Sequence, residues 1–371
     1  MGAKSDIKFT QISASVDMKL GGPSSVVLNT HELLTLNLKN YCLLVFGSSE
    51  LEAQNVYRIK TILNNRFGFI WKIASSRPIS KLKQSDAILI HGYYLFSTIY
   101  SVALYRGSRI YLMPHGTFEL YQQARHKFRK IIFSFLLEMF LKDRKIHFIT
   151  ASESESAPLK SSFPLNPVSV VGLGVSIPAV TKIRKTNSEE INLVFLGRIA
   201  EKKRIDLCLY SVKQLISSGY QVSLKIIGTG SLELKKSLTD LVEELDLMAN
   251  VKFLGHLGKT EMEKELSRSD IFILPSENEN FAIAVAESIA AEVPVIVSKN
   301  VAMHSFVDEH NVGITIAELD SNLICQAVLQ IMRGYDEYRI NCHKHREMLS
   351  WDRIFDSWLD VMEINPNSES K

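Results

Sequence analysis

The feature that most restricts the fold is a series of short apolar runs, each separated from the next by a longer amphipathic stretch. In the first half the runs cover residues 41–47, 86–90, 109–113 and 146–151. The alternation restarts after the polar, proline-containing passage 178–190, with runs at 191–197, 222–228, 251–255, 271–275 and 293–297. Uninterrupted apolar runs are typical of parallel strands covered by helices on both faces. The sequence therefore predicts an α/β chain with two Rossmann-like domains that face each other across a cleft.

The size and charge of the chain agree with this organisation. A chain of 371 residues, 46% of them hydrophobic, is long enough to bury two cores. Its 43 basic and 40 acidic residues are too evenly balanced for a dedicated nucleic-acid-binding protein. Residues 1–19 lack the pattern of a secretory signal, and no apolar run approaches the roughly 20 residues that span a bilayer. We therefore expect a cytoplasmic protein with no nucleic-acid partner.

The segment 271–297 holds the most informative pair of acids. A buried strand is expected to end at Pro275, and an alanine-rich helix is expected to begin near Phe281. Glu279 and Glu287 stand eight residues apart. On a helix this spacing advances about 12 Å and returns to nearly the same face. Both carboxylates could then point toward one elongated ligand.

The residues alone leave two interpretations of this segment open. In the first, the N–H groups of Asn280, Phe281 and Ala282 are helix-start donors that bind a phosphate. In the second, Glu279 caps the helix and Glu287 is a solvated acid. The apolar neighbours of Glu287 favour a ligand hydroxyl as its partner, because a carboxylate on an apolar helix needs one.

The same segment resembles a signature of glycosyltransferase family 4. The letters ENFAIAVAES at 279–288 look like the E-x7-E motif of that family, and FLGRIAEKKRIDL at 195–207 looks like its strand-end GR loop with the following lysine. The segments IIGTGS at 226–231 and VKFLGHLG at 251–258 follow in the same order. The resemblance implies the GT-B fold and a retaining, metal-independent hexosyltransferase, and the sequence contains no DxD-type carboxylate pair.

The resemblance also implies a role for individual residues. Arg198 and Lys203 would bind the donor diphosphate, Glu279 the hydroxyls of the donor sugar, and Glu287 the ribose hydroxyls. Donor binding would extend to the loops that contain Asn280, Phe281, Ala282 and Gly228. Many relatives have glycine where this chain has Asn280 and Ala282, so the side chain of Ala282 narrows the approach of a sugar.

The first domain carries a glycine-rich passage, Gly21-Gly22-Pro23-Ser24, between a β-like run at 12–16 and a helical stretch at 26–36. As a loop it could approach a phosphate or an acceptor closely through Gly21, Gly22 and Ser24; as a connector it would do neither. Its resemblance to the GGPS opening of family 4 favours the first interpretation.

Two apolar runs of the first domain are followed directly by His-Gly, at His91 and at His115. A single histidine at such a place is more often a structural residue. The pair resembles the HG and PHG segments of family 4, which implies that His115 lies beside the donor sugar or the acceptor, with His91 in a secondary role.

Together these patterns predict three parts. Residues 1–181 would form an acceptor-binding domain, residues 182–350 a nucleotide-sugar donor domain, and residues 351–364 a helix that returns to the first domain. The expected reaction moves a hexose from a UDP- or GDP-linked sugar to a hydroxyl of a glycan or lipid-linked acceptor, as in bacterial surface polysaccharide or glycolipid biosynthesis. The catalytic candidates are Glu279, His115, Arg198 and Lys203, and no cofactor is expected beyond the sugar nucleotide. Another GT-B enzyme, such as an epimerase or a phosphorylase, and a non-catalytic nucleotide-sugar scaffold are the alternatives.

The segment 125–145 has basic ends around an apolar middle. Its composition suits a core helix with solvated ends, which we favour because apolar surface is needed to cover the sheet. It also suits a helix that lies against an anionic membrane, which would place the protein at the inner face of the cell membrane.

Overall fold

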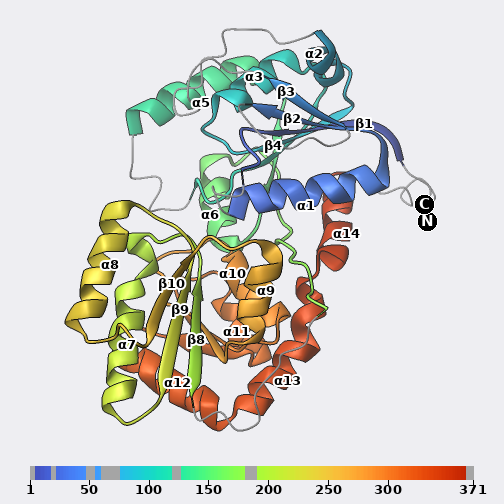
Figure 1. Ribbon diagram of the computed structural model, residues 1–371. Helices are drawn as coiled ribbons and strands as arrows, with labels where there is room; N and C mark the ends of the chain where they lie inside the picture. Colours follow the sequence, from blue (N-terminus) through green and yellow to red (C-terminus); the bar gives the residue numbers. More distant parts are fainter. Residues whose placement is uncertain are drawn as a thin grey trace. The chain divides into compact units, whose positions relative to one another are not determined.

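The computed structural model describes residues 5–17, 22–46, 55–59, 76–118, 127–179 and 190–364 (Figure 1). These residues divide into two compact units. The first unit is Met1–Gly172 with Ile354–Lys371, and the second is Leu173–Arg353. The chain thus changes unit at Gly172, ahead of the predicted linker 178–190, and again at Arg353.

The first unit is built on a seven-stranded sheet with the order β3-β2-β1-β4-β5-β6-β7. All of its strand pairs are parallel. The strands are β1 (Ser5–Ser13), β2 (Leu38–Phe46), β3 (Val56–Ile59), β4 (Ala87–His91), β5 (Arg109–Met113), β6 (Ile146–Thr150) and β7 (Val168–Val170). Its helices are α1 (Gly22–Asn37), α2 (Ser76–Lys83), α3 (Phe96–Leu104), α5 (Lys127–Leu141) and α6 (Glu153–Ser162).

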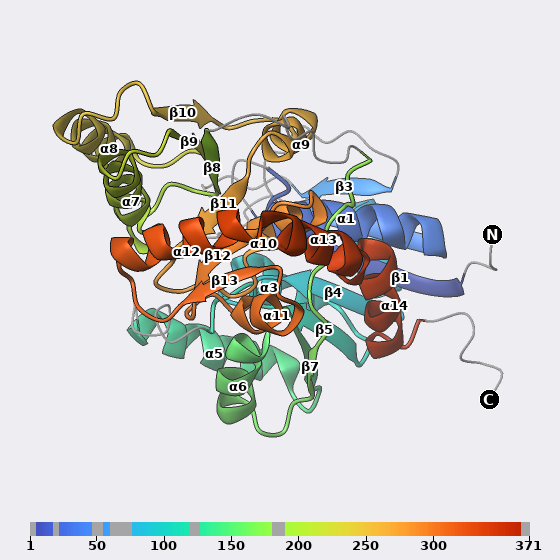
Figure 2. The same cartoon turned by 90° about the horizontal axis from the view of Figure 1, so that it is seen from below.

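The second unit is built on a six-stranded parallel sheet with the order β10-β9-β8-β11-β12-β13. The strands are β8 (Ile191–Leu196), β9 (Val222–Ile227), β10 (Val251–Gly255), β11 (Ile271–Leu274), β12 (Val295–Ser298) and β13 (Gly313–Ile316). Its helices are α7 (Ile205–Ser217), α8 (Leu232–Glu244), α9 (Lys259–Ser267), α10 (Ile283–Ala290), α11 (His304–His310), α12 (Ser321–Arg333) and α13 (Tyr335–His345). Two short 3-10 turns, η2 (Glu201–Lys203) and η3 (Arg346–Leu349), complete it. Helices α7 and α12 pack on strands of the sheet, and α8 packs against α7 (Figures 1 and 2).

The two parallel sheets confirm the predicted fold class. The strands formed where predicted because their apolar side chains are buried on both faces: every residue of Ala87–His91 and of Ile271–Leu274 is buried. The β-like run predicted at 12–16 overlaps the strand β1 only at Ile12 and Ser13. The strands β3, β7 and β13 were not predicted. They lie at the sheet edges and are only partly buried, so their sequences lack a continuous apolar run.

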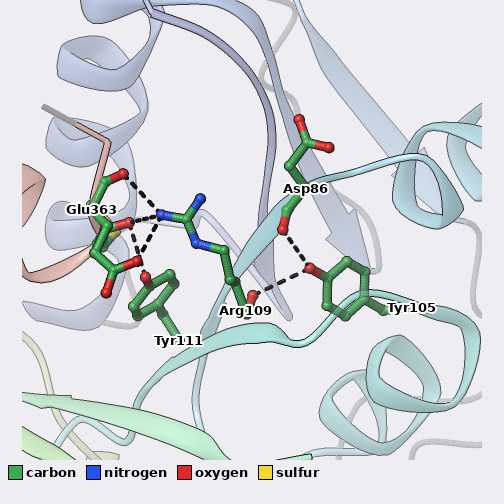
Figure 3. A network of polar contacts seen from close by, with 6 residues as sticks. Asp86, Tyr105, Arg109, Tyr111 and Glu363 are labelled. Carbon is green, nitrogen blue, oxygen red and sulfur yellow. Dashed lines mark hydrogen bonds and ion pairs between the residues drawn. The ribbon is translucent and has the colours of Figure 1, made fainter. Parts of the chain in front are cut away.

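The last helix, α14 (Trp351–Val361), carries the chain from the second unit into the first. Within the first unit, Arg109 donates to the carbonyl oxygens of Met362 and Glu363 over 3.0 and 2.8 Å, and the hydroxyl of Tyr111 donates to Met362 over 2.9 Å (Figure 3). The side chain of Trp358 is fully buried and donates to the carbonyl of Gly172. Residues far apart in the sequence thus complete one unit.

Candidate active site

Two loops of the second unit meet where the neighbouring strands β8 and β9 end. A methyl group added to Gly228 would lie 1.9 Å from the carbonyl oxygen of Gly197, so the two backbones leave no room for a side chain. Gly228 has a φ of +139°, a conformation that glycine adopts far more readily than other residues. The N–H of Ile199 also donates to the carbonyl of Thr229 over 2.8 Å. Gly228, a predicted donor-binding residue, therefore fixes the position of the loop that carries Arg198.

The loop after β8 brings two lysines to one carboxylate. Lys203 Nζ lies 2.8 Å and Lys202 Nζ 3.4 Å from the Oε1 atom of Glu279. The side chains of Lys203 and Glu279 are only 12% and 13% exposed, so water screens this pair weakly. Two of the predicted catalytic residues are thus brought together. Lys202 was not predicted, although it lies inside the motif that identified Lys203.

The backbone holds Glu279 in place from both sides. Its N–H donates to the carbonyl of Asn300 and its carbonyl accepts from the N–H of Ala302, each over 3.1 Å. The hydroxyl oxygen of Ser276 lies 3.0 Å from both a carboxylate oxygen of Glu279 and the carbonyl oxygen of Lys202, so its one hydrogen is shared between them. Ser276, which sequence reasoning also missed, therefore connects the end of β11 to the turn that carries the lysines.

Charge decides the protonation of this cluster. Burial alone would raise the pKa of Glu279, but the charges of Lys203 and Lys202 and hydrogen bonds from Lys203 and Ser276 outweigh it and lower this pKa below its usual value. Burial lowers the pKa of Lys203, an effect that Glu279 opposes and that Lys202 and Arg198 reinforce. Glu279 is therefore ionised, with an excess of positive charge beside it.

Arg198 and Arg204 differ in what they contact. Arg198 is exposed at the end of β8, and its charge is felt by Lys203. Arg204 instead forms a paired contact with Asp206 over 2.8 Å, with Glu277 at 3.6 Å. Arg198 can therefore add its charge to that of the lysines when an anion binds.

The predicted helical arrangement of the two acids is wrong. Helix α10 begins at Ile283, not near Phe281, and Glu279 lies in the extended segment ahead of it, bridged to Val301. Ala282 precedes the helix with a φ of 62° and a ψ of 67°. The N–H groups of the first helical turn therefore start at Ile283 rather than at Asn280, Phe281 and Ala282.

Glu287 lies within α10 and is half-buried among apolar neighbours. Burial raises its pKa to about 7; Lys259 partly opposes the effect and Glu263 adds to it. None of the hydrogen bonds between described residues uses its carboxylate. Glu287 thus retains the capacity to accept hydrogen bonds from a ligand.

In the first unit, His91 and His115 are in direct contact. The Nδ1 atom of His91 lies 2.9 Å from Nε2 of His115. His91 is buried at the end of β4, and half-buried His115 follows β5 with a φ of 56°. Such a φ is uncommon for a residue with a side chain and is often found at functional sites. The next residue, Gly116, donates its N–H to the buried carboxylate of Glu155, which was not among the predicted site residues.

The predicted glycine-rich loop of the first domain is largely a helix. Gly21 lies outside the described residues, whereas Gly22 and Ser24 belong to the first turn of α1. Pro23 explains the early start, because proline suits the first turn of a helix, where its missing N–H has no intrahelical acceptor. Ser24 is buried. A binding role for these residues stays a prediction, but it would be exerted from a helix start.

Helix α5 exposes much of its apolar surface, contrary to the favoured prediction of a core helix. Leu137 is buried, with Phe133 and Leu141 packed beside it. The opposite face leaves Ile131, Phe135 and Met139 exposed to 66%, 67% and 53%. Of the helices in the described ranges, none has the length and apolar character needed to cross a membrane.

Most of the second unit is similar to known glycosyltransferases. Residues 177–347 match the family of glycosyl transferases group 1. An uncharacterized glycosyltransferase of Methanocaldococcus jannaschii is 26% identical over 235 residues, which cover 58% of this chain and 59% of that protein. The amylovoran biosynthesis glycosyltransferase AmsK of Erwinia amylovora is 26% identical over 179 residues, which cover 46% of this chain and 43% of that protein. The chain spans about half the length of these relatives.

Solved structures extend the likeness to the whole fold. Sucrose-phosphate synthase of Thermosynechococcus elongatus has a TM-score of 0.75 and 15% identity, and the match covers 96% of this chain and 98% of that one. HepE of Anabaena, in complex with UDP and glucose, has a TM-score of 0.74 and 13% identity, with 96% and 99% covered. The second unit therefore matches the group 1 glycosyl transferases, and the chain as a whole has the GT-B fold of two Rossmann-like domains.

Proposed function

We propose that this protein is a retaining family 4 hexosyltransferase that uses a UDP- or GDP-linked sugar. The observation that carries the proposal is the pair Lys202 and Lys203 on the carboxylate of Glu279, with Arg198 close enough for its charge to lower the pKa of Lys203. A departing nucleoside diphosphate gains negative charge, which preorganised cations stabilise. The match to group 1 glycosyl transferases and the UDP and glucose bound to HepE support a sugar nucleotide as the ligand.

The reaction needs no group beyond donor and acceptor. The bond between the anomeric carbon and the diphosphate oxygen breaks, and the acceptor oxygen bonds to that carbon from the same face. The acceptor proton passes to the departing phosphate oxygen, so the products are the glycoside and the free nucleoside diphosphate. Arg198 and Lys203 would stabilise the leaving group, and Glu279 would bind hydroxyls of the transferred sugar. Glu287 would accept hydrogen bonds from the ribose.

Donor binding is tested first with a thermal-shift panel of UDP, GDP, ADP and CMP in the presence of EDTA. A ligand that binds the folded protein raises its melting temperature by mass action. We expect a shift from UDP or GDP that Glu287→Ala weakens. The matched control is Glu244→Ala, which removes an exposed acid at the end of α8. Absence of any shift, or a shift that requires a divalent metal, would contradict the proposal in its present form.

Turnover separates transfer from the alternatives. A transferase releases nucleoside diphosphate only when acceptor is supplied, whereas an epimerase changes the sugar nucleotide without acceptor and a scaffold shows no turnover. Arg198→Ala should lower turnover roughly ten- to a hundredfold, the effect of losing one charge-assisted contact. Arg333→Ala, at the exposed end of α12, is the control. Unchanged turnover in Arg198→Ala would remove this residue from the diphosphate site.

For the acceptor side, we propose contact with an anionic membrane through α5, as suits a lipid-linked acceptor. The exposed side chains of Ile131, Phe135 and Met139 recur every fourth residue and so lie on one face. Lys142 and Lys145 follow the helix and are exposed. An apolar face flanked by basic residues binds the interface of anionic bilayers. The likeness to AmsK supports a role in polysaccharide biosynthesis.

This contact is tested by co-sedimentation with vesicles that contain anionic lipid. The double variant Phe135→Glu, Met139→Glu should lose binding. Leu232→Glu, which changes an 86% exposed leucine on α8, should keep it. Equal binding by the wild type, the double variant and Leu232→Glu would exclude α5 as the membrane contact.

A further inference from the structure

A continuous chain of buried hydrogen bonds crosses the first sheet and ends at His115. Nδ1 of His31 lies 2.9 Å from the hydroxyl of Tyr41, which donates to Oε1 of Gln11. Nε2 of Gln11 lies 2.9 Å from Nε2 of His91, whose Nδ1 lies 2.9 Å from Nε2 of His115. The first four side chains are at most 9% exposed, so water does not compete for these contacts.

Strand register explains why these side chains meet. Gln11 pairs with Leu43 on β2 and with Leu89 on β4. Tyr41 and His91 stand two positions from these partners and therefore share one face of the sheet with Gln11. Helix α1 packs on that face, since Val27 and Thr30 both bond to Gln11.

The surroundings of Gln11 fix which end of its amide is the NH₂ group. Its Nε2 atom lies 3.2 Å from the carbonyl oxygen of Val27, and a carbonyl oxygen can only accept. Nε2 also lies 2.7 Å from the hydroxyl of Thr30, which itself donates to Val26. The opposite end, Oε1, accepts from Tyr41. The NH₂ group has two hydrogens and three neighbouring acceptor atoms, of which the Val27 oxygen is the most distant. The two shorter contacts, to Thr30 over 2.7 Å and to His91 over 2.9 Å, take the two N–H groups, so the Gln11 amide presents a donor to His91.

This orientation sets the tautomer of both histidines. Because an amide nitrogen does not accept, Nε2 of His91 must accept, and in a neutral ring its proton then lies on Nδ1. That N–H donates to Nε2 of His115, so the proton of a neutral His115 lies on its Nδ1. The ring planes are tilted by 20° with centres 5.1 Å apart, as for two rings that meet edge to edge.

Burial keeps both rings neutral. It lowers the pKa of His115 to about 4, and it lowers the pKa of His91 well below the usual range, where His115 adds to the effect. None of the hydrogen bonds between described residues uses Nδ1 of His115. The chain therefore ends in an N–H group that remains available.

We propose that Gln11 and His91 are positioning residues that fix His115 as the neutral Nδ1–H tautomer, which donates a hydrogen bond to a sugar oxygen of the substrate and does not act as a base. The sugar part of this inference rests on the function proposed above. The tautomer itself follows from the hydrogen bonds alone.

The tautomer is measured directly by long-range ¹⁵N–¹H NMR of the full chain labelled at histidine. The protonated and unprotonated nitrogens of a neutral imidazole give well-separated ¹⁵N resonances, and His115→Asn identifies the signal. At neutral pH we expect a protonated Nδ1 and an unprotonated Nε2. A protonated Nε2, or an imidazolium, overturns the proposal.

Two variants of His91 whose new side chains are nearly isosteric with each other then test whether the tautomer of His115 affects glycosyl transfer. His91→Asn keeps an N–H that can donate to His115, whereas His91→Asp offers only acceptors and moves the His115 proton to Nε2. We expect turnover to fall by less than about fivefold in His91→Asn but by at least about fiftyfold in His91→Asp. The ¹⁵N signals of His115 should switch only in His91→Asp. Equal losses in both variants would show a merely structural role and overturn the proposal.

The rise in melting temperature caused by UDP or GDP distinguishes a failure of this inference from a failure of the proposed function. This rise should be equal in wild type, His91→Asn and His91→Asp, because the predicted diphosphate residues belong to the other unit. If neither nucleotide shifts the wild type, the proposed function fails, while the ¹⁵N spectrum still decides the tautomer.

Discussion

The two units differ in the charge state of their buried polar groups. In the second unit, Glu279 and Lys203 are held as ions, 2.8 Å apart and barely exposed. In the first, His91 and His115 are held neutral by burial and by an ordered chain of donors. Preorganised cations suit a charged diphosphate, and a neutral N–H donor suits a sugar oxygen because it avoids the cost of burying a charge. Under the proposed function, the lysines of the second unit would meet the diphosphate, and His115 of the first unit would donate to a sugar oxygen.

The largest effect is expected from Lys203→Met, which removes the cation of the Lys203–Glu279 pair in the second unit. Removing one partner of a buried ion pair costs about 3–5 kcal/mol when the other is left without a counter-ion. The cost should be smaller here, because Lys202 remains 3.4 Å from Glu279. We therefore expect the melting temperature to fall and the thermal shift by UDP or GDP to disappear. Lys236→Met, at an exposed position of α8, should change neither. Adding Glu279→Gln to Lys203→Met should restore part of the stability, and a double variant as unstable as the single one would show that the pair is not coupled.

For the histidines of the first unit, we expect the free energy of unfolding to depend on pH. The pKa of His115 is about 4 when folded, against an ordinary value of 6.5, so between these values the unfolded chain binds more protons. The free energy of unfolding should thus fall as pH is lowered from about 6.5 to about 4, by up to roughly 3 kcal/mol for this group. Urea titrations at several pH values measure this. His115→Asn should flatten the curve, and an unaltered slope would contradict a buried neutral ring.

Glu287 predicts the opposite trend in the second unit. Its pKa is about 7 when folded, above the ordinary value of 4.5, so here the folded chain binds more protons. This contribution is complete below the unfolded value and is lost as pH rises through about 7. Glu287→Gln should therefore raise the free energy of unfolding above pH 7 by about 2 kcal/mol. Stabilisation that is independent of pH would show that desolvation of the carboxylate is not its cause.

The smallest effect concerns the backbone ahead of α10. Ala282 has a φ of 62°, where a side chain costs about 1–2 kcal/mol. Ala282→Gly relieves that strain but gains freedom in the unfolded chain, so we expect a net stabilisation of about 0.5–1 kcal/mol. Ala284→Gly, inside the helix, should destabilise by about 1 kcal/mol. If both variants lost stability equally, the strain at Ala282 would be absent.

The sequence predicts the fold well because its strands are fully buried. Their side chains face helices on both sides, so apolar runs such as Ile271–Leu274 are readable from composition alone. It also places His91 and His115 after adjacent runs, and β4 and β5 are neighbours in the sheet. The meeting of these two rings could therefore be anticipated from strand order.

Details set by distant contacts could not be predicted. Helix α10 starts later than its alanine-rich sequence suggests because the backbone of Glu279 pairs with residues near Val301. The role of Gln11 depends on Val27, Thr30 and Tyr41, which come from two other elements. A polar residue beside Ile12 in a buried strand was the available signal. This signal indicates an unusual position but does not identify the residues that Gln11 contacts.

The return of the chain through α14 has a consequence for how the protein is made. Translation delivers the whole of Leu173–Arg353 before Met362 and Glu363 emerge to cap Arg109 and Tyr111. Until then, the first unit lacks the indole of Trp358, which is fully buried in the finished protein. On the ribosome the second unit can thus fold first, and the core of the first unit is completed only when Trp358, Met362 and Glu363 have been synthesised.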